Sequence, residues 1–556
     1  MFISGNESLA KQALRCCAAA VTLWLVMVVA ALISRSIAPV DETRYLAVAW
    51  EMWLNHNFLV PHLDGEPYSH KPPLMFWLIN AGWWLFGVNE IWPRLLPALF
   101  QLGSLLLTVV IAKQLWPGRL DIMRHAPLIL MTTLFWALYT TAVMFDFLLV
   151  FFVLCAVVGI IRVWKDNAWY SGWLLAGAAM GLGILAKGPV VLVYVLPPAL
   201  LAPWWMENKS CSWLKWYVSL VLATALAGGI ALAWALPAAA AGGAQYAGQI
   251  LWSQTAERMV HSMAHEKPFW WYLEAGPLLL LPWIIWPALW RAQIALYKSP
   301  FDAGVRFAIA LLVPQFILLS LISGKQPHYL LPLFPPLALL FARSLFTTEF
   351  SQQVTPHLRH PVIAALAIAL LGITLLVLSR SADLLKQYAW HSGISPAWGV
   401  SLLVIAAVVY RMRQRSLQHA VALMSGSAIA IWLVVYLSVI PLMAPILNLQ
   451  DASQTIATLQ ANKIPVAHIS RYDGQFHFLG RLQQPLPSLI YKKDAAAWAK
   501  QHPQGRIVAY YYKDARPDFD KIIPDYHQPY RGGHMAIWQS ETLLSVPEVL
   551  QTAHSN

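Results

Sequence analysis

The 556-residue sequence is 58% hydrophobic and only 12% charged, and its charged residues lie mainly in short breaks between long apolar runs. Soluble domains carry about 25% charged residues, so this composition excludes an ordinary soluble protein and indicates a polytopic membrane protein. The formal net charge of +12 does not predict a nucleic-acid partner, because Lys and Arg are dispersed at the ends of apolar runs.

The N-terminal apolar run, at about residues 18–33, follows Lys11 and Arg15. It is long and no convincing cleavage motif follows it, which favours an uncleaved signal anchor over a signal peptide. The four cysteines are Cys16, Cys17, Cys155 and Cys211. The predicted topology places them on or near the inner side of the membrane, so we expect no disulfide framework and no CxxC metal site.

Thirteen apolar runs are predicted to span the membrane, at residues 17–38, 92–114, 125–144, 145–163, 172–187, 189–206, 215–238, 275–292, 306–323, 327–343, 361–379, 397–410 and 420–440. With the N-terminus inside, every inner break contains Lys or Arg, as the positive-inside distribution requires. The runs at 172–187 and 397–410 are shorter than the roughly 20 residues of a straight span, so half-helices are an alternative there. The expected fold class is an all-α polytopic bundle.

Two segments differ from this pattern. Residues 39–90 combine charges, His and Pro with aromatic residues, which indicates amphipathic helices along the outer interface joined by a Pro-rich loop. After about Pro441 polar residues return, with strand-like stretches at residues 464–469 and 506–512. We expect a membrane domain over residues 1–445 and a small α/β domain over residues 446–556, which the parity of thirteen spans places outside the cytoplasm.

Paired carboxylates, Asp41 and Glu42, come directly after the first span. One interpretation is structural: an interfacial helix starts after Pro39 and takes both acids in its first turn. The other is that Asp41 is a general base that deprotonates or orients an acceptor during sugar transfer. Residue chemistry alone favours the structural interpretation.

Further candidates recur at the predicted outer ends of spans. Lys71 precedes Pro72 and Pro73, and a cation at headgroup height is suited to a lipid phosphate, although a Lys that only reaches towards the interface is an alternative. Asp146 lies between two apolar runs, where a functional acid and a turn cap are both possible. The remaining candidates are Lys187 before Gly188, the group Glu257, Arg258, His261, His265 and Lys267, and Lys325 with Tyr329.

Two other types of site receive little support. Gly181, Gly183 and Lys187 do not form a G-x-x-x-x-G-K-[ST] phosphate loop. His70 and His265 are candidate ligands of a divalent metal, but their separation in the sequence makes that signal weak. We therefore expect no certain cofactor. The outward position of the candidates argues for a sugar donor that reaches the outer face on a lipid, since nucleotide sugars are made in the cytoplasm.

These motifs resemble the polyprenyl-phosphate-sugar glycosyltransferases of the GT-C class, which include protein O-mannosyltransferases and, most similar, the bacterial aminoarabinose transferases of lipid A. The resemblance covers most of the membrane portion and runs through residues 41–45, Lys71-Pro72, Asp146, residues 185–188, His265 with residues 268–270, and residues 325–332. Their order along the chain makes the set fairly specific.

The resemblance implies an inverting GT-C enzyme in the bacterial inner membrane, with its active site and C-terminal domain in the periplasm. It implies Asp41 as the catalytic carboxylate, Asp146 as a second acid, and donor-phosphate contacts from Arg44, Lys71, Arg258, Lys325 and Tyr329, with Glu42, Lys187 and His265 as further candidates. The chain has His70 where these enzymes commonly have Glu, which places metal binding in doubt. The expected partners are a polyprenyl-phosphate-linked sugar and an envelope lipid, glycan or protein acceptor.

Two other classes of function remain as alternatives. A transporter or flippase also has many spans and broken helices, but it predicts polar groups near the bilayer midplane rather than at span ends. A structural or assembly protein has no need of clustered acids and cations. The sugar and the acceptor are not identified by the sequence.

Overall fold

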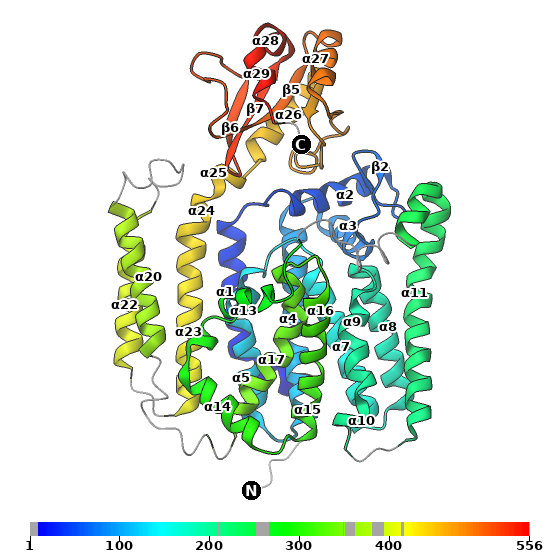
Figure 1. The fold of residues 1–556 in the computed structure, drawn as a ribbon, viewed down its shortest axis with the longest axis vertical. Helices are drawn as coiled ribbons and strands as arrows, with labels where there is room; N and C mark the ends of the chain where they lie inside the picture. Colours follow the sequence, from blue (N-terminus) through cyan, green and yellow to red (C-terminus); the bar gives the residue numbers. More distant parts are fainter. Residues whose placement is uncertain are drawn as a thin grey trace.

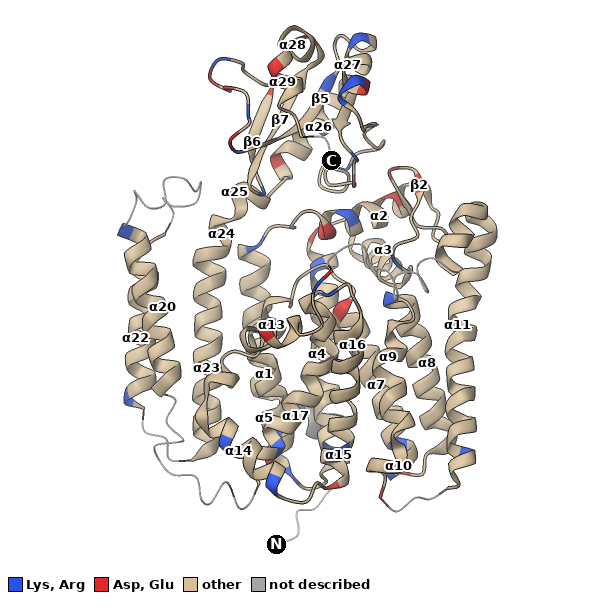
Figure 2. Ribbon diagram, viewed as in Figure 1, with Lys and Arg blue, Asp and Glu red and all other residues tan. Residues whose placement is uncertain are grey.

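The computed structural model describes residues 9–207, 211–251, 266–347, 350, 362–380, 394–412 and 416–554. Figure 1 shows a broad bundle of long, roughly parallel helices, with a small mixed sheet and its helices beyond one end. Charged residues gather near the two ends of the helices, whereas the middle of the bundle is mostly uncharged (Figure 2).

Eight helical segments in the described part of the chain are long and apolar enough to cross a membrane. They are Cys17–Ser34 in α1 (Leu9–Ser34), α4 (Ile91–Leu115), α7 (Asp146–Lys165), α8 (Trp169–Lys187), Trp213–Leu251 with α11 (Trp213–Gly248), Ala303–Leu321 with α15 (Ala303–Ala310) and α16 (Val313–Leu321), α20 (Val362–Arg380), and Leu417–Leu442 with α23 (Leu417–Val434). Shorter apolar helices are α3 (Leu74–Phe86), α9 (Val190–Leu200) and α22 (Pro396–Arg411). The protein is a multi-pass helical membrane protein, and the number thirteen stays a prediction.

Several runs that we predicted as single spans are broken into shorter segments. Run 125–144 contains part of α5 (Leu120–Met131) and all of α6 (Leu134–Leu138). Run 275–292 contains η2 (Trp283–Ile285) and parts of α13 (Trp271–Leu279) and α14 (Pro287–Lys298). Run 327–343 contains η3 (Pro327–Leu333) and part of α17 (Phe334–Leu345). Prolines lie at or near the breaks in runs 275–292 and 327–343, and a proline lacks the backbone N–H that would continue a helix. Hydropathy detects the apolar run but not these interruptions.

Close packing fixes the position of two helices that matter for the site. A Cβ atom added at Gly159 in α7 would lie 2.6 Å from the carbonyl oxygen of Gly172 in α8, and one at Gly172 would lie 2.7 Å from that of Gly159. Small residues allow helices to approach this closely within a membrane. Since consecutive helices joined by a short loop run antiparallel, the first residue of α7 and the last of α8 lie at the same end of the pair.

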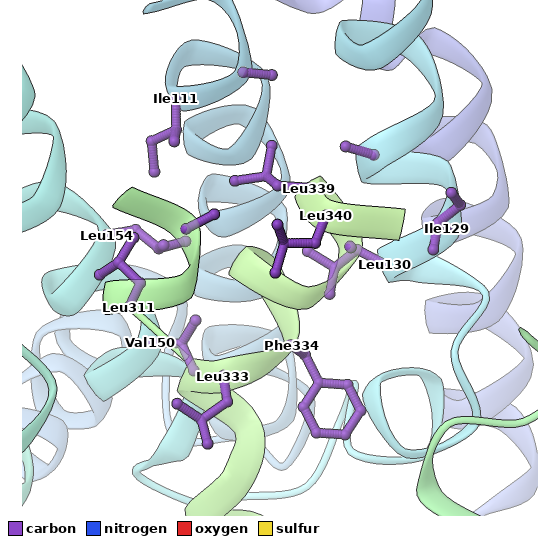
Figure 3. Close-up of a cluster of buried hydrophobic side chains, with 14 of the residues drawn as sticks. Ile111, Ile129, Leu130, Val150, Leu154, Leu311, Leu333, Phe334, Leu339 and Leu340 are labelled. Carbon is purple, nitrogen blue, oxygen red and sulfur yellow. The ribbon is translucent and has the colours of Figure 1, made fainter. Parts of the chain in front are cut away.

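Apolar side chains from α4, α5, α7 and α17 fill the centre of the bundle (Figure 3). The labelled members of this cluster are buried and come from segments far apart in the sequence, namely Ile111, Ile129, Leu130, Val150, Leu154, Leu311, Leu333, Phe334, Leu339 and Leu340. This core packs α4, α5, α7 and α17 against one another.

The segment between α1 and α4 forms α2 (Asp41–Asn55), a two-stranded hairpin of β1 (His62–Leu63) and β2 (Glu66–Pro67), and α3. The two helices joined by a loop agree with the prediction for residues 39–90, and they lie between the bundle and the sheet in Figure 1. We did not predict the hairpin. Its turn, Asp64-Gly65, has positive φ at both residues, which is the backbone that Asp-Gly turns favour.

Residues 450–554, here called the C-terminal region, form a five-stranded sheet in the order β4-β3-β5-β7-β6. Its strands are β3 (Val466–Ile469), β4 (Ser488–Leu489), β5 (Arg506–Tyr512), β6 (Tyr526–Tyr530) and β7 (Gly533–Gln539), and its helices are α26 (Gln450–Ala461), α27 (Lys492–Gln501), α28 (Ser540–Ser545) and α29 (Pro547–Gln551). β3 is parallel to β4 and β5, whereas β7 is antiparallel to β5 and β6. The two strands expected at 464–469 and 506–512 correspond to β3 and β5.

Candidate active site

One cavity of about 740 Å³ brings together many of the predicted site residues. It is bordered by the start of α2, the loop before α3, the start of α7, the end of α8, α9, α11 and the segment before and within η3. The predicted residues that line it are Asp41, Arg44, His70, Lys71, Asp146, Lys187 and Tyr329. Residues separated by almost 300 positions therefore share one site.

Asp41 is the first residue of α2, and its side chain is 55% exposed. The residue at the N-cap position is Val40, and no side-chain hydrogen bond caps the helix in this part of the structure. The Asp41 carboxylate lies 3.5 Å from Arg44 Nη1, one turn along α2. Burial lowers the pKa of Arg44, but Asp473, Tyr68 and Asp41 together raise it above its usual value, so the guanidinium is charged. Asp41 thus faces the cavity beside a cation.

Glu42 has a different environment, although it follows Asp41 directly. Its buried carboxylate accepts hydrogen bonds from Nη1 and Nη2 of Arg35, at 2.5 and 2.9 Å. It also accepts hydrogen bonds from the backbone N–H groups of Ala38, at 2.7 Å, and Val143, at 2.6 Å. It is not among the residues that line the cavity. These contacts make Glu42 a structural link from the end of α1 to α2 and the segment before α7.

Asp146 and Lys187 form a buried ion pair across the α7–α8 hairpin. Lys187 Nζ donates to Asp146 Oδ1 at 2.5 Å, and the two side chains are 8% and 2% exposed. Among the described residues, Asp146 Oδ2 has no hydrogen-bond partner. A buried carboxylate oxygen without a partner is costly, and here it lies at the edge of a cavity that could hold a ligand group.

Aromatic residues complete the polar part of the cavity. The ring of Tyr329 lies 5.0 Å from Lys187 Nζ, and its backbone carbonyl accepts the hydroxyl of Tyr194 at 2.7 Å. Lys71 Nζ lies 5.8 Å from the centre of the Phe145 ring, next to Asp146 in the sequence. The cavity also includes His328, from the predicted motif at residues 325–332, and Tyr68 and Tyr194, which we did not predict as site residues. An aromatic residue in an apolar run gives no signal that separates a cavity wall from a core.

Most of the rest of the cavity wall is apolar. It is formed largely by α9, α11 and the residues just after α11, through Leu192, Val193, Ala231, Leu232, Ala235 and Ile250, among others. In Figure 1, α11 lies at the edge of the bundle. The cavity therefore combines a charged region below α2 with a hydrocarbon surface, which fits a ligand with a charged head and a lipid tail.

Some predicted site residues lie elsewhere. Lys325 is buried, and its ammonium donates to the carbonyl oxygens of Lys267, at 3.0 Å, and Ile322, at 2.6 Å; it is not part of the cavity lining. Arg258 and His265 lie outside the described residues. The described chain contains no group of three His, Cys, Asp or Glu residues that could hold a metal ion. His70 lines the cavity, and His265, the other predicted metal ligand, lies outside the described residues.

Comparisons with known proteins show what this chain is similar to. The family model for dolichyl-phosphate-mannose-protein mannosyltransferase matches residues 13–242. An undecaprenyl phosphate-alpha-4-amino-4-deoxy-L-arabinose arabinosyl transferase from Erwinia tasmaniensis is 27% identical over 531 residues, covering 90% of this chain and 94% of that protein. A Pseudomonas fluorescens enzyme of the same name is 30% identical over 312 residues, which is 55% of each chain.

The fold agrees with these sequence matches. The crystal structure of ArnT from Cupriavidus metallidurans bound to undecaprenyl phosphate has a TM-score of 0.70 and 19% identity, and covers 94% of this chain and 97% of its own. The apo structure of the same protein also has a TM-score of 0.70, with 18% identity. The chain is similar in sequence to these transferases over most of its length and shares the fold of ArnT. The GT-C resemblance read from the sequence is thus confirmed.

Proposed function

We propose that this protein is a glycosyltransferase that moves a sugar from a polyprenyl-phosphate donor to lipid A on the outer face of the bacterial inner membrane. The observation that carries the proposal is the cavity, because its cations and carboxylates adjoin an apolar wall suited to a polyprenyl chain. The curated relatives are named for undecaprenyl phosphate-linked aminoarabinose transfer, which supports the same class of donor.

In the proposed reaction, an acceptor oxygen forms a bond to the anomeric carbon of the sugar while the bond from that carbon to the lipid phosphate breaks. The electrons of the broken bond leave with the polyprenyl phosphate, whose negative charge is stabilised by Lys71 and Arg44. Cations that are already in place stabilise this charge without reorganisation. Tyr329 and the Asp146–Lys187 pair border the same space and hold the sugar-phosphate group.

Asp41 has one of two roles, depending on the acceptor. If the acceptor is a hydroxyl, its proton passes to the Asp41 carboxylate as the new bond forms. If the acceptor is a lipid A phosphate, it is already largely ionised near neutral pH, and Asp41 orients it. Arg258, in the part of the chain that the structure leaves undescribed, remains a proposed phosphate contact on the resemblance alone.

The proposed phosphate contact predicts a specific loss. Lys71→Ala should lower transfer at subsaturating donor by about tenfold or more, because a charge-assisted contact to phosphate is worth roughly 1.5 to 3 kcal/mol. Folded yield in detergent should stay close to that of the wild type, and Lys71→Arg should retain part of the activity. Normal transfer by Lys71→Ala at subsaturating donor would rule out the phosphate role.

A protein acceptor is the second candidate, since the matching family model describes protein mannosyltransferases. Mass spectrometry of lipid A and of envelope proteins from cells with and without the chain separates the two. We expect a sugar-sized mass increase on lipid A only in cells that contain the protein. An increase on proteins with unchanged lipid A would overturn the acceptor that we propose and support the alternative.

The proposal also fixes the orientation of the chain. Thirteen spans from an inner N-terminus place the C-terminal region in the periplasm, so a reporter fused after His554 should behave as exported. A reporter fused after Gly118, in the loop between α4 and α5, should remain cytoplasmic and serves as the control. A cytoplasmic signal from the His554 fusion would contradict the parity of the spans and the outward position of the active site.

A further inference from the structure

A loop of the C-terminal region lies directly against α2, the helix that carries Asp41. Gly474 in this loop has a φ of +71°, and a Cβ atom there would lie 2.6 Å from Ala47 Cβ and 2.8 Å from Leu63 Cδ1. Any larger residue would both strain the backbone and collide with α2 and the hairpin. The loop is therefore shaped for close contact with the membrane portion.

Further contacts fix the C-terminal region against the same helices. The indole N–H of Trp50 in α2 donates to the carbonyl oxygen of Leu482 at 2.9 Å. Trp83 in α3 stacks on Phe478, with ring centres 5.1 Å apart and an angle of 10° between the planes. Buried residues of α2, α3 and the C-terminal region form one continuous apolar cluster. The loop around Gly474 is thus held at a defined position over α2.

Asp473, immediately before Gly474, reaches the cation beside the candidate catalytic carboxylate. Its Oδ2 lies 3.4 Å from Arg44 Nη2, while Arg44 Nη1 lies 3.5 Å from Asp41 Oδ1. The Asp473 and Arg44 side chains are 29% and 22% exposed. One guanidinium therefore lies between two carboxylates from opposite ends of the chain, and pairs tightly with neither.

We propose that Asp473 is a positioning residue for the transfer reaction: by sharing Arg44 with Asp41, it keeps the Asp41 carboxylate available to the acceptor. This inference rests on the proposed function. Without Asp473, the guanidinium has one carboxylate partner in this cluster and closes on Asp41, since a contact of about 2.8 Å is the preferred geometry for such a pair. Asp41 then accepts hydrogen bonds from Arg44 instead of contacting the acceptor.

The test is a double-mutant cycle on the purified full-length protein. Asp473→Asn keeps the shape of the side chain and removes its charge, so kcat should fall about tenfold while the folded yield is unchanged. Asp473→Glu retains the carboxylate and should stay within about threefold of the wild type. Asp518→Asn is the matched control, because Asp518 also pairs with a cation, Lys521 at 3.2 Å, within the C-terminal region; it should transfer normally.

The Arg44→Gln background separates positioning from a structural role. If Asp473 acts through Arg44, adding Asp473→Asn to Arg44→Gln should change kcat less than twofold, measured over extended incubations. An equal tenfold loss in both backgrounds would overturn the inference, as would wild-type kcat in Asp473→Asn alone. A wild-type protein that transfers no sugar from a polyprenyl-phosphate donor would instead overturn the proposed function, so the two failures are distinguishable.

Discussion

Asp41→Asn should reduce turnover at saturating donor by roughly 100-fold or more, the usual scale for a general acid–base group. An amide keeps the size of the carboxylate but cannot accept the proton or carry the negative charge. The side chain is 55% exposed at the start of α2, so the substitution should leave the folded yield and melting temperature nearly unchanged. Turnover is measured per folded protein in detergent.

The same variant separates the two interpretations of Asp41 that the sequence leaves open. Within the described residues Asp41 makes no capping hydrogen bond, so a purely structural role rests on its charge in the first turn of α2, which is worth about 1 kcal/mol or less, and predicts near-normal transfer. Asp514→Asn, at an exposed position of the C-terminal region, is the control for the loss of one negative charge. Turnover of Asp41→Asn within a few-fold of the wild type would reject the catalytic role and leave Asp146 as the next carboxylate to test.

The second large effect should come from the buried ion pair. Lys187→Met removes the cation and leaves the Asp146 carboxylate buried and unpaired, which costs about 3 to 5 kcal/mol in buried pairs. We expect a clearly lower melting temperature in detergent and little transfer. Lys215→Met is the control. Lys215 is exposed near the start of α11, at the end of the helix away from the cavity, so its loss should have a small effect on both measurements.

A double variant separates pairing from chemistry. Asp146→Asn together with Lys187→Met removes both charges, so it should recover most of the lost stability while transfer stays low. Recovery of transfer along with stability would mean that the pair serves only to hold α7 against α8. A melting temperature of Lys187→Met equal to that of the wild type would contradict the buried pair itself.

The sequence predicts the membrane class and several of the residues that line the cavity because both leave local signals. Apolar runs identify α1, α4, α7 and α8, and charged residues next to such runs identify Asp41, Lys71, Asp146 and Lys187. A charge beside a hydrocarbon layer is costly unless it is used or paired, which is why these positions are informative. The cavity brings all four together, as the predicted outer ends of different spans require.

The parts that the sequence does not predict depend on contacts between distant segments. Glu42 and Asp41 are adjacent acids, yet only the position of Arg35 and Val143 makes Glu42 structural. Lys325 belongs to a motif of the resemblance, but its ammonium is bound by backbone carbonyls. Nothing in the sequence around Asp473 distinguishes it from other acidic residues of the C-terminal region. Only the packing of its loop on α2 brings its carboxylate to Arg44.

The most direct test of the account is transfer by the purified wild-type protein in vesicles, with a labelled sugar supplied on polyprenyl phosphate and lipid A as acceptor. The account predicts labelled lipid A together with an equal amount of released polyprenyl phosphate, and no labelled product when a nucleotide sugar replaces the lipid donor. Movement of the intact labelled donor across the vesicle membrane, without any transfer to an acceptor, would contradict it.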